Sequence, residues 1–116
     1  MDVNDSLLQK LREVASRRGI TSYGHLVEEL DLDMSSPADR RKIGEILGAI
    51  SEEEHRRGRP MISAVVVGSE TSLPGQGFFS LARRLGKLAG GNETGFFAEE
   101  LRRVHDFWTS EEGQDV

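Results

Sequence analysis

Few residues in this chain could carry a reaction. There is no cysteine, so a thiol nucleophile and a thiolate metal site are both absent. The histidines His25, His55 and His105 lie far apart and form no HxxxH pattern, which argues against a metal site. Ser63 is followed by Ala64, and a serine without an adjacent base is a poor nucleophile. We therefore expect no metal, no cofactor and no enzymatic activity; a hydrolase or transferase using Ser63 is the alternative.

Clusters of basic residues are the second informative pattern. Two of them could contact nucleic acid: Arg40, Arg41 and Lys42, and Arg56, Arg57 and Arg59. The first stands at the start of a predicted helix, where a helix-turn-helix protein meets DNA, although it could also be a solvated turn between Asp39 and Glu45. The second could add phosphate contacts, or could pair with Glu52 to Glu54 along a helix. The net charge of -5 argues against indiscriminate nucleic-acid or membrane binding, but a local basic face can override it.

Apolar residues at helical spacing predict three helices that carry these side chains. They lie within residues 4–19, 20–30 and 35–50. The third is the best signalled, because Ser36 can cap it and Pro37 suits its first position. Ser51 could begin a new helical turn or continue the same helix.

The run MISAVVV is the only strongly apolar stretch, and its β-branched residues between Pro60 and Gly68 predict a strand at 62–67. A single strand needs a partner, which could be Ile20 to Thr21, the following loop or another chain. Glycines and Pro74 then predict a turn-rich return into the helical segments 78–86 and 97–108.

These elements predict one domain, residues 1–108, followed by a disordered acidic tail, residues 109–116. The fold class is α+β and helix-rich: a winged helix-turn-helix-like core with one main strand, a turn-rich wing loop and two C-terminal helices. The acidic N-terminal segment lacks a basic leader, and no run is long enough to cross a bilayer, so a cytoplasmic protein is expected.

The segments ITSYGHLVEEL, RRKIGEILGAI and VVGSETSLPGQGF resemble the winged-helix domain of DNA alkyltransferases and alkyltransferase-like proteins, over roughly residues 20 to 78. The resemblance implies that Tyr23 packs against a target nucleotide and that Arg41 fills the gap left by a flipped base. It also implies that Val66 to Ser69 begin the wing.

The chain departs from this family at its reactive motif. When Val66 to Ser69 are aligned, the cysteine position falls on Ser63 and the activating histidine falls on Ala64. Alkyl transfer is therefore not expected. The resulting prediction is a non-enzymatic protein that binds duplex DNA through the following residues: Tyr23, Arg40, Arg41, Lys42, Arg56, Arg57, Arg59 and Ser69.

The segments GRPMISAVVV, PGQGFFSLARRLG and FFAEELRRVHDFW also resemble an uncharacterised bacterial and phage-associated protein family, which implies no function. Nearly all the aromatic residues lie in this last third: Phe78, Phe79, Phe96, Phe97, Phe107 and Trp108. Two adjacent Phe pairs on helices favour some exposure. The alternative function is therefore a protein-protein interaction module, as a homodimer or as part of a phage or defence-related assembly, that does not bind DNA.

Overall fold

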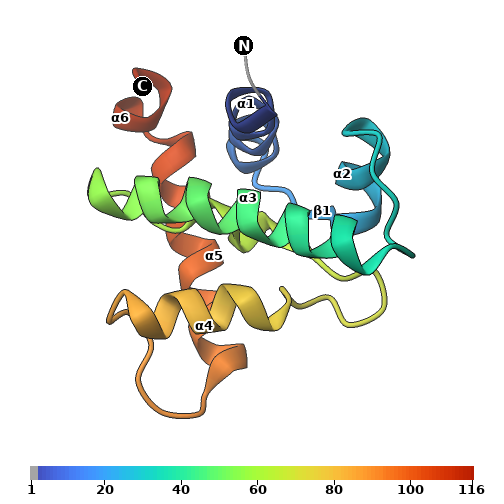
Figure 1. Cartoon of the computed structure of the whole chain (residues 1–116). Helices are drawn as coiled ribbons and strands as arrows, with labels where there is room; N and C mark the ends of the chain where they lie inside the picture. The colour runs from blue at the N-terminus through green and yellow to red at the C-terminus, as the bar shows by residue number, and fades with distance from the viewer. Residues whose placement is uncertain (1–2) are drawn as a thin grey trace.

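The first helix, α1 (Val3–Ser16), buries one apolar stripe and ends where Arg18 takes a positive φ of 53°. The structure is a computed structural model, and it describes residues 3–116. After β1 (Thr21–Ser22), the short helix α2 (Tyr23–Glu29) begins because Ser22 Oγ accepts a hydrogen bond from the His25 N–H. Helix α1 stands beside the right-hand unit of β1 and α2 in Figure 1.

Helix α3 (Pro37–Arg56) is the longest element and crosses the front of the molecule in Figure 1. Ser36 caps it and Pro37 occupies its first position, as predicted. No break occurs at Ser51, which is fully buried within the helix and does not cap a new turn. The helix ends before Gly58, whose φ of 77° suits a residue without a side chain.

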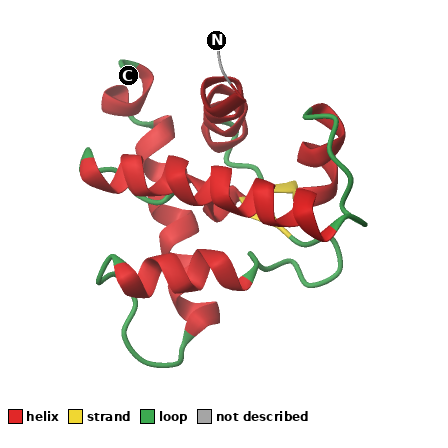
Figure 2. Ribbon diagram, viewed as in Figure 1, coloured by secondary structure: helices red, strands yellow, loops and turns green. Residues whose placement is uncertain are grey.

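The predicted strand 62–67 is wrong over most of its length. Ile62–Val65 form a 3-10 turn, η1, and only β2 (Val66–Val67) is extended, pairing in parallel with β1. The strand is short because β1 has only two residues that can form backbone hydrogen bonds with it. Side chains replace the missing ladder: Glu100 accepts from the Met61 N–H and Ser51 from the Ser63 N–H. Figure 2 shows how little strand the fold contains.

The remaining chain is helical. Helix α4 (Gln76–Arg84) lies below α3 in Figure 1, and α5 (Glu93–Thr109) runs behind both. Residues 109–116, predicted to be a disordered tail, instead contain the end of α5 and a short helix, α6 (Glu111–Gln114). The Gln114 amide bonds to the Trp108 carbonyl oxygen, and Gly113 is buried against the end of α5, so this segment has tertiary contacts that its polar composition does not reveal.

The buried residues form one core in which η1 is central, because α1, α3 and α5 all pack on it. The described chain is thus a helix-rich α+β fold with a two-stranded parallel sheet. Among residues 3–116, no helix combines the length and apolarity needed to cross a membrane.

The aromatic residues do not form the exposed surface that the sequence favoured. Phe78, Phe79, Phe97 and Trp108 are buried, and Phe96 and Phe107 pack partly buried against the core. Phe78 and Phe79 are both buried although they are adjacent on α4, and their ring centroids lie 5.3 Å apart in an edge-to-face arrangement.

Candidate functional site

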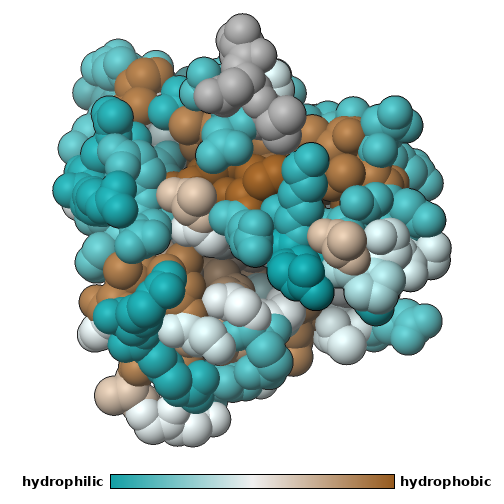
Figure 3. All heavy atoms as spheres, in the orientation of Figure 1, coloured by the Kyte–Doolittle hydropathy of each residue, from teal (hydrophilic) through white to brown (hydrophobic). Residues whose placement is uncertain are grey.

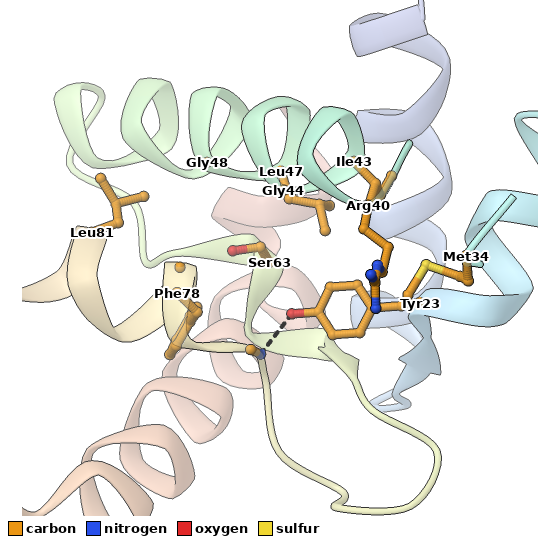
Figure 4. Close-up of a pocket in the computed structure, with 12 residues that line it drawn as sticks. Tyr23, Met34, Arg40, Ile43, Gly44, Leu47, Gly48, Ser63, Phe78 and Leu81 are labelled. Carbon is orange, nitrogen blue, oxygen red and sulfur yellow. Dashed lines mark hydrogen bonds between the residues drawn. The ribbon is translucent and has the colours of Figure 1, made fainter. Parts of the chain in front are cut away.

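A cavity of about 360 Å³ lies between α3, the start of α4 and η1. Its lining is mostly apolar or glycine: Tyr23, Met34, Arg40, Ile43, Gly44, Leu47, Gly48, Ser63, Gly75, Gly77, Phe78 and Leu81. Figure 4 shows these residues converging from α2, α3, η1 and α4. A second recess between α3 and α4 adjoins the cavity and shares Gly44, Gly48, Gly77 and Leu81 with it.

Tyr23 forms one wall of the cavity. It begins α2, and its hydroxyl oxygen accepts a hydrogen bond of 2.8 Å from the Gly75 N–H, drawn as a dashed line in Figure 4. Burial raises the pKa of the Tyr23 phenol above its usual 10.0, and the bond from Gly75 opposes that shift. The ring therefore stays neutral near pH 7 and links α2 to the loop before α4.

Ser63 lies deep in the cavity and is 6% exposed. Its Oγ accepts a hydrogen bond of 2.6 Å from the Ser51 hydroxyl. The cavity lining contains no histidine, carboxylate or lysine, so no general base stands ready to activate Ser63. This arrangement gives no support to the alternative of a serine-dependent enzyme.

The first basic cluster is exposed on the opening turns of α3. Arg40 also lines the cavity, and Arg41 lines the adjoining recess together with Glu45 and Arg84. None of Arg40, Arg41 and Lys42 forms an ion pair with a carboxylate in residues 3–116. Figure 3 shows hydrophilic side chains around a recessed seam between α3 and α4. The cluster is thus available to an anionic partner, with Glu45 as the nearby opposing charge.

The second basic cluster lies at the other end of α3. A rise of 1.5 Å per residue places Arg56 about 22 Å along the helix from Arg41. Arg56 and Arg57 pair with Glu53, at 2.8 and 3.1 Å. Arg59 is 13% exposed, pairs with Glu54 at 2.5 Å and lies over the Trp108 ring. Within the described residues, the predicted basic side chains therefore fall into one cluster without ion pairs, at Arg40 to Lys42, and one cluster with ion pairs, at Arg56 to Arg59.

Ser69 and the histidines occupy other places. Ser69 is exposed in the loop 68–75, whose far end Tyr23 holds through Gly75. His25 lies 3.3 Å from Glu29, and His105 Nε2 is 2.8 Å from the Gly19 carbonyl oxygen. Within the described part of the chain, no three His, Asp or Glu side chains are grouped so that they could hold a metal ion.

Sequence reasoning gave Ser51, Gly44 and Gly48 no part in a binding site. Gly44 and Gly48 are one helical turn apart on α3, and they face the cavity with Gly77 of α4. A Cβ built on any of the three meets no atom within 4 Å. Glycines four residues apart inside a strongly predicted helix were the available signal, because glycine there costs about 1 kcal/mol relative to alanine.

Comparison of the chain with family models, with curated proteins and with solved structures gave no match. A functional proposal for this chain therefore depends on the geometry above and on the resemblance of its motifs.

Proposed function

We propose that this chain binds duplex DNA without modifying it, through the start of α3 and Tyr23. In this proposal, α2 and α3 act as a helix-turn-helix, and β2 with the loop 68–75 acts as the wing. The first turns of α3 meet the DNA backbone and major groove.

The single observation that carries the proposal is that Arg40, Arg41 and Lys42, on an exposed helix start, have no carboxylate partner among residues 3–116. A phosphate can bind these cations without breaking an existing ion pair, and the positive end of the helix dipole adds to the attraction. Binding through Arg56 or Arg57 would compete with Glu53 for the same guanidinium groups. We therefore assign most phosphate contacts to the first cluster.

The cavity beside this cluster supports a second part of the proposal. Its volume of about 360 Å³ lies at the small end of the range of about 300–1,000 Å³ typical of small-molecule sites. The alkyltransferase resemblance implies that Tyr23 packs against a nucleotide and that Arg41 fills the gap that the base leaves. We propose that one unstacked base enters the cavity, which costs least when that base is already unpaired.

The test is a salt series on duplex binding, measured by fluorescence anisotropy for the native chain and for Arg41→Ala. We expect affinity to fall steeply with salt, and Arg41→Ala to weaken binding and reduce the salt slope by about one. Arg102→Ala is the matched control, since it removes one positive charge from α5, where Arg102 is paired with Glu99. The absence of binding at about 50 mM salt would reject the proposal.

The alternative, an interaction module that excludes DNA, has less support, because four of the six aromatic residues in the last third are buried and the other two are partly buried. It would regain support from a chain that binds no duplex but forms a stable dimer in light scattering.

A further inference from the structure

Ser51 and Ser63 form a buried polar pair at the inner end of the cavity. Ser51 on α3 is fully buried, and Ser63 on η1 is almost so. The Ser51 oxygen accepts from the Ser63 N–H at 3.0 Å, and the Ser51 hydroxyl donates to Ser63 Oγ at 2.6 Å. Two bonds thus fix the position of one hydroxyl group beside the cavity.

The hydrogen atoms of this pair can be counted. Each serine hydroxyl has one hydrogen to donate, and the bond between the Ser51 and Ser63 oxygens uses one of the two. We assign that bond to the Ser51 hydrogen, because Ser51 is fully buried and has no other acceptor in residues 3–116, whereas Ser63 lines the cavity. No residue in 3–116 accepts a hydrogen bond from the Ser63 hydroxyl, which lines the cavity and points into it in Figure 4. Ser63 therefore offers one donor to whatever occupies the cavity.

The other residues that line the cavity indicate which kind of ligand this donor would favour. Around Ser63 the cavity walls are the side chains of Leu47, Phe78 and Leu81. Tyr23 and Arg40, the other polar side chains of the lining, are also donors, so the side chains present donors and no carboxylate acceptor. A polar group in such surroundings favours a ligand that satisfies it over one of the same shape that does not.

We infer that the Ser63 hydroxyl, held in place by Ser51, is the specificity-determining group of the cavity. It selects a planar heteroaromatic ring whose inserted edge carries a hydrogen-bond acceptor, either a carbonyl oxygen or a ring nitrogen. The inference rests on the proposed function, because it assumes that this ring is a base of the bound DNA. Ser51 is a positioning residue, because it acts on the ligand only through Ser63.

The experiment compares duplexes in which one base faces an abasic site. Binding of a duplex with thymine at this position is compared with binding of one that carries its apolar shape mimic, difluorotoluene. Adenine is compared in the same way with methylindole. The two bases in each comparison differ in hydrogen-bond acceptors but hardly in shape. We expect the native chain to prefer the natural base over its mimic by about three- to tenfold in at least one pair. Ser63→Ala removes this preference while affinity for the mimic stays the same.

Two further variants separate specificity from stability. Ser51→Ala keeps the Ser63 hydroxyl but removes the hydrogen bond that holds it in position. The preference for the natural base over its mimic should therefore become smaller without disappearing. Ser16→Ala removes a hydroxyl from α1, outside the cavity, and should leave the preference unchanged. Thermal unfolding of each variant checks that the fold is retained, and Ser51→Ala carries the test if Ser63→Ala does not fold.

The outcomes distinguish this inference from the proposed function. Salt-dependent binding with no preference, or with a preference that survives Ser63→Ala, overturns the role of Ser63 and leaves DNA binding intact. If no duplex binds, DNA binding is rejected. Thymidine and adenosine are then titrated into the protein while the NMR resonance of the residue 63 amide is monitored, which tests whether the cavity binds a heteroaromatic ring. A shift that is lost in Ser63→Ala supports that site, and no shift overturns it.

Discussion

At the scale of single residues, Tyr23 is the clearest junction in the molecule. It begins α2, walls the cavity and accepts a hydrogen bond from Gly75, which is 52 residues away in the chain. The same ring also lines a smaller hollow formed with the loop 68–75. One side chain therefore fixes the loop that the proposal treats as a wing relative to the helix that it treats as part of the DNA-binding motif.

Replacing this hydroxyl has a predicted cost. Tyr23→Phe keeps the ring and removes the acceptor of the Gly75 N–H, so the free energy of unfolding should fall by about 1 kcal/mol in urea titrations. An unchanged free energy of unfolding would mean that water replaces the hydroxyl without loss.

The alkaline pH dependence of stability has a definite sign at this residue. Burial raises the Tyr23 pKa in the folded chain, so between pH 10 and the folded pKa the folded state binds more protons than the unfolded state. This contribution to the free energy of unfolding is complete below pH 10 and is lost as the pH rises through the folded pKa. Tyr23→Phe should lack this decline. Because Tyr23 is the only tyrosine, phenolate absorbance follows its titration alone.

At the scale of elements, α3 combines two demands. Its apolar side packs on η1, while its first half keeps open the cavity and the recess beside it. Gly44 and Gly48 are poor helix formers at positions where an added Cβ atom would meet no neighbour within 4 Å. Their presence therefore leaves space for a ligand at the expense of helix stability.

Alanine substitutions at two glycines of this region should have opposite effects. Gly48→Ala should raise the free energy of unfolding by about 0.5–1 kcal/mol, because the helix gains propensity and nothing is displaced. Gly58→Ala has equal space but a φ of 77°, so it should lower the free energy of unfolding by about 1 kcal/mol. Chemical denaturation measures both. Changes of the same sign would show that packing, not backbone conformation, controls these positions.

At the scale of the whole molecule, buried charge joins the C-terminal helices to the rest of the core. Glu100 of α5 is fully buried, accepts from the Met61 N–H at 2.9 Å and contacts Lys87 Nζ at 2.5 Å. One carboxylate therefore ties together α5, the start of η1 and the connection that follows α4.

Removing the Glu100 carboxylate should lower the free energy of unfolding far more than removing the carboxylate of its neighbour Glu99. Glu100→Ala leaves the partly buried Lys87 ammonium and the Met61 N–H without their partner, so we expect the free energy of unfolding to fall by about 3 kcal/mol. Glu99→Ala removes only exposed pairs with Arg102 and Arg103, so it should lower the free energy of unfolding much less. Urea unfolding compares the two, and equal losses would contradict the role given to Glu100.

Local signals were sufficient to place the longer helices, but not α6. Apolar periodicity and the Ser36–Pro37 start predicted α3, and Thr21 was among the partners proposed for the apolar run. The exposed cluster at Arg40 to Lys42 was also visible, because its position at a helix start is a local property. The DNA-binding role of that cluster and the alkyltransferase resemblance remain predictions.

Tertiary contacts determined the conformation of the apolar segment 61–67 and the composition of the cavity. Met61–Val67 is β-branched and apolar, but two partner residues cannot support a long strand, so side chains from α3 and α5 turn its first part into η1. The same contacts place Ser63 in a cavity and supply Ser51, 12 residues earlier, as its partner. Apolar periodicity and caps in the local sequence specify the longer helices, whereas hydrogen-bond partners distant in the chain determine which hydroxyl faces the cavity.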